Sequence, residues 1–239
     1  MESLPFDMAA TSFDDQYNGC VDKMDDKVGK LQRTEFATSN SNYEEVWKAA
    51  TTKWNRKKPK GLKQQYAIAV FAYTKSSDSL YSQLNEAVRK AGQSEDYYLR
   101  NFHFKSFHYL LTRALQVLVT SSNHKCYITY RGVKGITFTT ELYRKVRFGH
   151  FASSSLNKKT AEGYGDDTFF TIKTCYGAYI KDFSFFPNEE EVLIPPYELF
   201  LVEDFKETGG KTHISLTSEG KHSNYNCVYV KGNCGETPF

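Results

Sequence analysis

The stretch "PNEEEVLIPPYE" at residues 187–198 decides how the second half of the chain is interpreted. Three consecutive glutamates lead directly into the apolar run "VLI", which two prolines close. A short β-branched run ended by prolines predicts a buried strand. In an extended backbone, Glu189 and Glu191 would share one face, and Glu190 would lie on the other and be solvated. Because two carboxylates on one face repel each other, the spacing predicts a cationic ligand or transition state that offsets the repulsion.

Two simpler interpretations of the glutamate triplet remain open from the residues alone. A run of glutamates is often a solvated acidic loop. Glycosidases also use two carboxylates, but in most of these enzymes the two lie far apart in the sequence. An aromatic loop with Phe183, Phe185 and Phe186 precedes the triplet, and its presence is consistent with one compact cationic centre.

Several short segments around this stretch have the same strand-like character. They are rich in β-branched and aromatic residues and are separated by Gly, Asn, Asp and Pro. They read "CYITYRG", "VRFGHFASSSL", "TFFTIKTC", "GAYIKDFSFF", "HISLTS" and "YNCVYV". No long helical pattern separates them, which favours antiparallel or mixed sheets over a doubly wound arrangement. Residues from about 124 to 239 are therefore predicted to form a mainly β core.

Helical patterns dominate residues 1 to about 123. Asp14 and Asp15 suit the start of a first helix, and Asn42 suits the cap of a second. Ser79 and Gly92 bracket "LYSQLNEAVRKAG", and "SFHYLLTRALQVL" carries an apolar stripe at helical spacing. The apolar run "YAIAVFAYT" is expected to be a strand. Helices followed by strands predict an α+β fold, with the helical half packed on the sheets as a single domain over residues 1–239.

Composition and charge exclude several classes of protein. The chain has 239 residues, 40% of them hydrophobic, which is a globular composition. A formal net charge of +3 gives no argument for nucleic acid. The basic run at residues 53–63 is interpreted as a solvated loop around Pro59 and Gly61, with an anion or membrane contact as the alternative. No apolar run is long enough to span a membrane, and no signal peptide or lipid-anchor signal is evident.

The cysteines and histidines do not form a recognisable metal site. None of the cysteines has the close paired spacing of a zinc site, and the histidines show neither a metal triad nor a Cys/His dyad. The cysteines are Cys20, Cys126, Cys175, Cys227 and Cys234. Their wide separation suits long-range disulfides in an oxidising compartment, with one left over. Five reduced thiols in a cytosolic protein are the alternative.

Two further polar features are candidates for a functional site. Arg131 ends an apolar strand-like run, where its donors could bind a phosphate or carboxylate, and Gly132 would let a flat ligand approach the backbone. Three serines beginning at Ser153 could bind a sugar or orient a carboxylate. A solvent-exposed arginine and a polar turn are the simpler alternatives. No Gly-x-Ser-x-Gly motif surrounds the serines, so a serine hydrolase is not indicated.

Taken together, these residues form a known order: an arginine on one strand, a serine on the next and Glu-x-Glu ahead of a later strand. In this order the sequence resembles the vertebrate ecto-ADP-ribosyltransferase family, which is arginine-specific. The resemblance covers nearly the whole chain, including "SFDDQYNGC", "HFKSFHYLLTRALQVL", "TYRGVKG", "VRFGHFASSSL" and "FSFFPNEEEVLIPPYELF". It implies a core of two mostly antiparallel sheets, NAD as the donor substrate without a metal, and arginine-bearing proteins as acceptors.

The resemblance implies a role for each residue of the motif. Glu191 would stabilise the positive charge that develops at the ribose, and Ser153 would position this glutamate and the ribose. Arg131 would hold the phosphate side of NAD, and the backbone of Gly132 would hold the nicotinamide amide. Glu189 would orient the acceptor arginine, which favours transfer over hydrolysis.

The resemblance also implies supporting NAD contacts and a location. Tyr73 and Arg147 match positions near the dinucleotide, and Tyr164 falls where the family usually has a phenylalanine stacked on the nicotinamide end. Phe185 and Phe186 lie in the loop that would meet the target protein, or else pack internally. The implied protein is an extracellular monomer, secreted or held by a lipid anchor whose signal is not in this sequence.

The same family pattern implies the disulfides Cys20–Cys227 and Cys126–Cys175 and leaves Cys234 unassigned. An NAD glycohydrolase on the same scaffold is one alternative function. A disulfide-bonded surface module without catalytic activity is the other.

Overall fold

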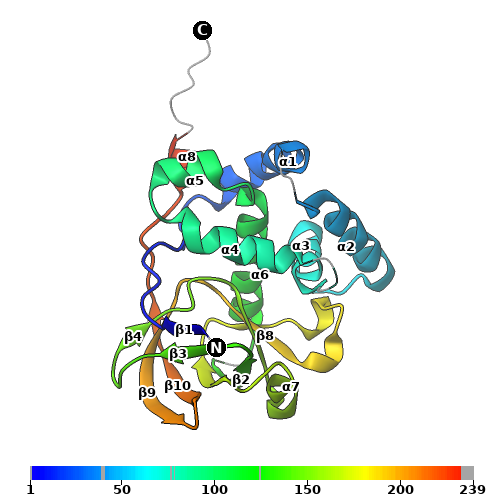
Figure 1. Ribbon diagram of the computed structural model, residues 1–239. Helices are drawn as coiled ribbons and strands as arrows, with labels where there is room; N and C mark the ends of the chain where they lie inside the picture. Colours follow the sequence, from blue (N-terminus) through cyan, green and yellow to red (C-terminus); the bar gives the residue numbers. More distant parts are fainter. Residues whose placement is uncertain (1, 39–40, 76, 78, 124, 233–239) are drawn as a thin grey trace. The chain divides into compact units, whose positions relative to one another are not determined.

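The contacts of the computed structural model divide the chain into two compact units, and Figure 1 colours the chain by sequence. The first unit contains Met1–Ala9 and Leu115–His222, and the second contains Ala10–Ala114 and Ser223–Phe239. The sequence predicts a change from helices to strands near residue 123, within a single domain. The two divisions differ because residues 2–9 belong to the unit formed mainly by the second half of the sequence, and residues 223–232 belong to the unit formed mainly by the first half. The residues that the structure describes are 2–38, 41–75, 77, 79–123 and 125–232.

An eight-stranded sheet is the main element of the first unit, with strand order β4-β9-β10-β6-β2-β5-β8-β7. Strands β10 and β6 run parallel, and the other described pairings in this sheet are antiparallel, as predicted. Strands β1 and β3 form a separate two-stranded parallel sheet. The strands are β1 (Glu2–Pro5), β2 (Tyr127–Val133), β3 (Ile136–Thr139), β4 (Lys145–Val146), β5 (Ala152–Ser155), β6 (Thr168–Thr174), β7 (Ala178–Tyr179), β8 (Glu191–Ile194), β9 (Glu198–Thr208) and β10 (Lys211–Lys221).

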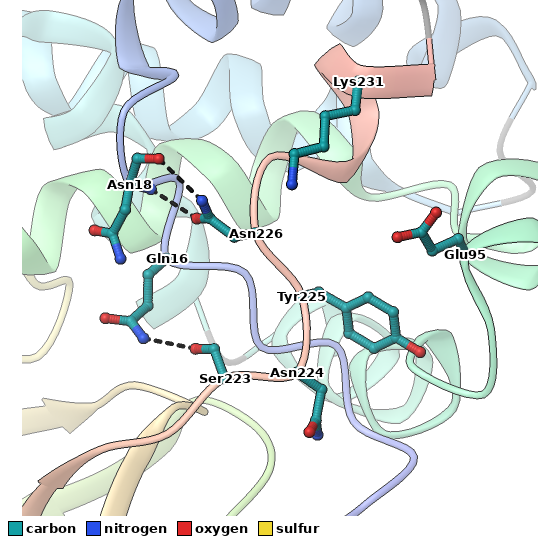
Figure 2. A pocket seen from close by; sticks show the side chains of 8 residues that line it. All are labelled: Gln16, Asn18, Glu95, Ser223, Asn224, Tyr225, Asn226 and Lys231. Carbon is teal, nitrogen blue, oxygen red and sulfur yellow. Dashed lines mark hydrogen bonds between the residues drawn. The ribbon is translucent and has the colours of Figure 1, made fainter.

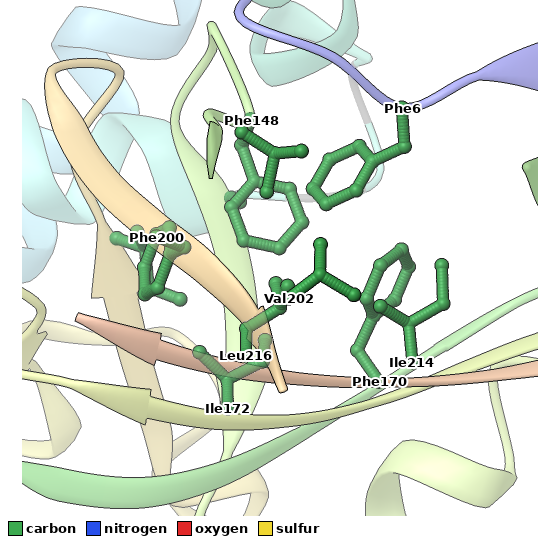
Figure 3. Packing of buried hydrophobic residues seen from close by; sticks show 11 residues of the cluster. Phe6, Phe148, Phe170, Ile172, Phe200, Val202, Ile214 and Leu216 are labelled. Atoms are coloured by element: carbon green, nitrogen blue, oxygen red, sulfur yellow. The ribbon is translucent and has the colours of Figure 1, made fainter. Parts of the chain in front are cut away.

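An aromatic and aliphatic cluster forms the core of this unit (Figure 3). Phe6 lies just after β1 and packs on Phe148 and Phe170, with ring centroids 5.2 and 5.3 Å apart. This contact explains why the first residues belong to the β unit. Ala152 of β5 and Ile194 of β8 belong to the same cluster and are fully buried. Because protein cores are close-packed, this burial holds the two strands in fixed positions.

The second unit is helical, in agreement with the sequence pattern. Its helices, together with α6, which runs across the boundary between the units, are α1 (Val21–Thr38), α2 (Tyr43–Lys57), α3 (Gln64–Thr74), α4 (Leu80–Ala91), α5 (Glu95–Asn101), α6 (Lys105–Ser121) and α8 (Val228–Gly232). Asn42 and Ser79 stand at the predicted N-cap positions, but neither side chain makes a capping hydrogen bond. Gly92 closes α4 as predicted. The basic run is partly helical, because α2 continues to Lys57.

Two predicted strands are helices. The run "YAIAVFAYT" lies in α3, where every residue from Tyr66 to Thr74 is buried. A helix that is buried on all sides has no polar face, so periodicity cannot distinguish it from a buried strand. The run "YNCVYV" ends in the short helix α8. There the backbone N–H of Val228 donates to the carboxylate of Asp15 at 3.1 Å, an N-terminal contact that the local sequence does not reveal.

The role predicted for Asp14 and Asp15 at a helix start is wrong. Helix α1 begins only at Val21. Asp14 instead accepts hydrogen bonds from the backbone N–H groups of Asn224 and Tyr225, at 2.9 and 3.0 Å. These buried carboxylates therefore attach the C-terminal segment to the N-terminal part of the second unit, which a local pattern cannot predict.

Both disulfides implied by the family resemblance are present. Cys20–Cys227 joins residues 207 positions apart in the second unit, and Cys126–Cys175 joins the start of β2 to the end of β6 in the first. Cys234 lies outside the described residues. Among the described helices, none is long and apolar enough to cross a membrane.

Candidate functional site

Three neighbouring strands of the first unit carry the arginine, the serine and the glutamate. Arg131 lies on β2, Ser153 on β5 and Glu191 on β8, and these strands are adjacent in the sheet. Strands β5 and β8 are antiparallel, with Ser155 opposite Glu191 and Ser153 opposite Leu193. Ser153 and Glu191 are therefore diagonal neighbours on one face of the sheet. The structure thus brings together residues that are up to 60 positions apart.

The serines and the arginine bind the backbone around this site. The Nη1 atom of Arg131 donates to the carbonyl oxygen of Ser153 at 2.8 Å. The hydroxyl of Ser154 donates to the carbonyl of Val192 at 2.7 Å, and the hydroxyl of Ser155 to that of Glu189 at 2.6 Å. Two of the three serines therefore attach the glutamate segment to β5.

Glu191 has an unusual electrostatic environment. It is 6% exposed, and burial raises its pKa to about 7. The nearby charge of Glu189 raises the pKa further, whereas a hydrogen bond from Ser153 and the charge of Arg131 lower it. A carboxyl group with these competing influences changes its protonation state near neutral pH, which is common at catalytic sites.

The segment with the other two glutamates is not extended, so the predicted geometry is wrong. Glu189 ends the 3₁₀ turn η3 (Pro187–Glu189), and Glu190 has a left-handed backbone with φ of +49°. The carboxylate of Glu190 has a partner that Glu189 and Glu191 do not share. Lys181 of η2 (Lys181–Phe183) forms an ion pair with it at 2.8 Å. The turn and the ion pair with Lys181, and not the alternation of side chains along an extended strand, therefore set the direction of the Glu190 side chain. The carboxylate of Glu189 nevertheless lies close enough to influence Glu191.

Gly132 makes a close backbone approach, but the approaching groups belong to the protein. A Cβ atom at this position would lie 2.1 Å from the carbonyl oxygen of Gly165 and 2.2 Å from that of Ala161. Ala161 belongs to the short helix α7 (Lys158–Glu162). Glycine is therefore required here to seat α7 and the following loop on β2.

Two residues that the resemblance places near the dinucleotide, Arg147 and Tyr73, are buried and bonded within the protein. Arg147 is 1% exposed and donates to the carbonyl oxygens of Met8, Ala9 and His222, at 2.8, 3.3 and 2.9 Å. These contacts favour a structural role over the predicted NAD contact. Tyr73 lies on α3 of the second unit, buried, and its hydroxyl accepts a hydrogen bond from Asn85 at 3.1 Å.

Among the residues predicted in the loops near the site, Tyr164 and Phe186 are exposed to solvent. Tyr164 is 55% exposed, and its hydroxyl donates to the carboxylate of Glu189. Phe186 is 42% exposed, Phe185 is half-buried and Phe183 is buried. Phe183 therefore packs internally, whereas Phe186 presents an aromatic ring at the surface.

A polar hollow in the second unit is a different kind of feature (Figure 2). Its volume is about 440 Å³, and its walls are Gln16, Asn18, Glu95, Ser223, Asn224, Tyr225, Asn226 and Lys231. Much of this lining is already bonded. Asn226 exchanges two hydrogen bonds with the backbone of Asn18, at 2.9 and 3.0 Å, and the Tyr225 hydroxyl donates to the Gly92 carbonyl at 2.7 Å. The hollow lacks the apolar walls of a typical small-molecule site.

The sequence patterns assigned no role to Lys181 and gave Ser155 only the role shared by the serine cluster. Eight residues that include two short 3₁₀ turns separate Lys181 from its partner Glu190, so no periodic signal connects them. Ser155 is part of the predicted serine cluster, and its spacing from Ser153 already places the two on one strand face. No group of side chains among the described residues has the arrangement of a metal site.

The chain is similar, in sequence and in fold, to known ADP-ribosyltransferases. The family model described as "NAD:arginine ADP-ribosyltransferase" matches residues 6–224. The erythroblast NAD(P)(+)--arginine ADP-ribosyltransferase of Gallus gallus is 48% identical, over 100% of this chain and 80% of the relative. The GPI-linked NAD(P)(+)--arginine ADP-ribosyltransferase 1 of Homo sapiens is 42% identical, over 96% of this chain and 76% of the relative. A crystal structure of a mutant of the eukaryotic mono-ADP-ribosyltransferase ART2.2 in complex with NAD matches with a TM-score of 0.79 and 41% identity, covering 95% of this chain and 99% of that one.

Proposed function

The chain belongs to the family of NAD:arginine ADP-ribosyltransferases, and we propose that it transfers ADP-ribose from NAD to arginine side chains of target proteins. Nicotinamide is the leaving group. The proposal rests mainly on one observation: the buried carboxyl of Glu191 lies beside Ser153, Arg131 and a second carboxylate. The family model spans most of both units, which supports a single domain that works as one enzyme.

Glu191 acts on the bond between the ribose and nicotinamide. When this bond breaks, its electron pair leaves with the nicotinamide nitrogen, and positive charge develops at the ribose carbon C1′. The carboxylate of Glu191, held by Ser153, stabilises charge that exists only in the transition state. Because the site is buried, this stabilisation is stronger than it would be in water. The acceptor nitrogen then bonds to C1′ and loses a proton.

Arg131, Gly132 and Tyr164 bind the dinucleotide. The guanidinium of Arg131 presents several N–H donors, of which one binds the Ser153 carbonyl, and it interacts with the phosphate side of NAD. The backbone of Gly132 binds the nicotinamide amide, and the exposed ring of Tyr164 covers the nicotinamide end. The buried contacts of Arg147 and Tyr73 support structural roles.

Glu189 binds the acceptor. A free guanidinium is a cation and a poor nucleophile, so it must be oriented toward C1′. The carboxylate of Glu189 can accept hydrogen bonds from two guanidinium nitrogens and direct the third. The repulsion between Glu189 and Glu191 is offset because both carboxylates approach positive charge during the reaction.

Glu189→Gln tests this division of roles. The substitution keeps the size of the side chain and removes the charge that binds the acceptor. We expect ADP-ribosylation of agmatine to fall about 100-fold, since a charge-assisted contact to the acceptor is lost, while NAD hydrolysis stays within about twofold. Nicotinamide release and product formation are measured on one preparation by chromatography. An equal fall in both activities would show that Glu189 acts on NAD and not on the acceptor.

Two alternatives predict different outcomes for the unmodified protein with labelled NAD and agmatine. An NAD glycohydrolase would release nicotinamide and free ADP-ribose without a labelled agmatine product. A surface module without catalysis would release no nicotinamide. The carboxylate at Glu189, two residues before Glu191, favours the transferase.

An extracellular location fits the chemistry of the chain. Two disulfides suit an oxidising compartment, and the human relative is named as GPI-linked. We therefore place the enzyme outside the cell or on its surface, as a monomer that meets arginine-bearing proteins there. Any association with a membrane is through a lipid anchor, and nucleic acid is not a partner.

A further inference from the structure

The hydroxyl of Tyr164 makes a contact that NAD binding does not require. Tyr164 follows α7, and its hydroxyl donates to the Oε1 atom of Glu189. Among the described residues, this is the one hydrogen bond to the Glu189 carboxylate. An aromatic ring that only covered nicotinamide would not need a hydroxyl at this position. The contact therefore connects the loop after α7 to the proposed acceptor residue.

A second contact holds the backbone of the same glutamate. The hydroxyl of Ser155 donates to the Glu189 carbonyl at 2.6 Å and accepts from the backbone N–H of Asn157 at 2.9 Å. Asn157 in turn caps α7, with its Oδ1 atom accepting from the N–H groups of Lys159 and Thr160 at 2.9 and 3.4 Å. The start of α7 is thus connected to the backbone of Glu189, and the loop after its end is connected to the carboxylate.

Helix α7 itself is fixed on the strand that carries Arg131. The carbonyl oxygens of Ala161 and Gly165 approach β2 at Gly132, where any side chain would collide with them. The backbone N–H of Tyr164 donates to the carbonyl of Ala161 at 3.1 Å, which continues the helical turn up to the tyrosine. Because this backbone is held at both ends, the hydroxyl of Tyr164 meets Glu189 at a defined position.

From these contacts we propose that Tyr164 is a positioning residue for the acceptor arginine, acting through Glu189. A carboxylate has two oxygens and about four acceptor positions. Tyr164 occupies a position on Oε1 and fixes the plane of the group, which leaves Oε2 directed toward the incoming guanidinium. Planar pairing between arginine and carboxylate depends strongly on this orientation. The inference rests on the proposed function and adds a determinant of acceptor use.

The hydroxyl and the ring of Tyr164 have different roles: the hydroxyl orients Glu189, and the ring covers the nicotinamide end. Removing the hydroxyl leaves the ring in place and leaves Glu191 with Ser153 and Arg131, so cleavage of NAD should change less than use of the acceptor. It frees the Glu189 carboxylate to rotate, so use of the acceptor should suffer. Because the tyrosine is half exposed to water, the effect should be moderate.

Tyr164→Phe is the direct test. We expect the KM for agmatine to rise about fivefold, as for a hydrogen bond to a charged group in partly exposed surroundings, and to rise more than the KM for NAD, because the ring that covers the nicotinamide end is kept. The matched control is Tyr143→Phe, which removes a hydroxyl from a tyrosine that is 75% exposed and outside the site. The control should not change any of these constants.

A double substitution checks that the effect passes through Glu189. In Glu189→Asp the carboxylate is one methylene shorter and loses its contact with Tyr164, so adding Tyr164→Phe should change agmatine use no further. A rise in the KM for NAD as large as that for agmatine, or an unchanged KM for agmatine in Tyr164→Phe, would overturn the inference. If the unmodified protein released no nicotinamide, the proposed function would fail, and the inference with it. That result is distinct because no variant is needed to see it.

Discussion

Glu191 at the start of β8 and Glu198 at the start of β9 are both buried, but their surroundings differ. Burial raises the pKa of both groups. Glu198 accepts hydrogen bonds from the Thr174 hydroxyl and from the backbone N–H groups of Cys175 and Tyr176, at 2.6, 2.7 and 3.1 Å. Its carboxylate is therefore well satisfied inside the protein.

Glu191 has fewer stabilising partners and one unfavourable neighbour. A hydrogen bond from Ser153 and the charge of Arg131 favour its ionised form, whereas the charge of Glu189 opposes it. A buried carboxylate that keeps acceptor capacity next to a like charge is available to a ligand. Burial alone therefore does not identify a candidate catalytic carboxyl, whereas the number of protein donors separates Glu191 from Glu198.

Glu191→Ala should give the largest effect and separates the roles most clearly. We expect nicotinamide release to fall roughly 1000-fold, because charge stabilisation in the transition state is lost. Stability should change by less than about 1 kcal/mol, since removing a poorly solvated charge offsets the lost packing. Steady-state assays and urea unfolding measure the two quantities. Comparable activity in variant and parent would show that another group stabilises the ribose.

Glu198→Ala should have a large effect on stability and a small effect on activity, the opposite of Glu191→Ala. The substitution leaves the N–H groups of Cys175 and Tyr176 without their acceptor in the interior, so unfolding should become easier by about 4 kcal/mol. At low temperature the folded variant should retain nicotinamide release within about twofold. Urea midpoints compared with those of Glu191→Ala provide the check. A stable but inactive Glu198→Ala variant would contradict the structural role.

Glu191→Gln should change how the stability of the protein depends on pH. Folded Glu191 holds its proton up to a pKa of about 7, whereas the ordinary value of 4.5 applies when the chain is unfolded. The parent protein therefore loses stability as pH rises from 4.5 through 7, and the neutral glutamine does not. At pH 8 the variant should be more stable by on the order of 3 kcal/mol, and the difference should vanish below pH 4.5. Urea unfolding at pH 4 and pH 8 measures it, and a constant difference would refute the assigned pKa.

The strands that carry the candidate site could be predicted because their residues follow local patterns. Arg131, Ser153 and Glu191 each belong to a short strand, and strand patterns are visible in the sequence. The turn at Glu190 could not be predicted, because its left-handed backbone and its pairing with Lys181 depend on surrounding loops. Helix α3, which is buried from Tyr66 to Thr74, was missed because this part of its pattern has no polar face.

The α+β class, the helical first half and the strands of the second half, and the arginine, serine and glutamates at spacings that the family resemblance interprets, are all read from the sequence. The partners of the carboxylates are set by the tertiary structure. Asp15 receives the N–H of Val228 from 213 positions away, Glu198 receives that of Cys175, and Glu189 receives the hydroxyl of Tyr164. Periodicity records which face of an element is buried, whereas the partners of a buried charge are selected when distant segments close on one another.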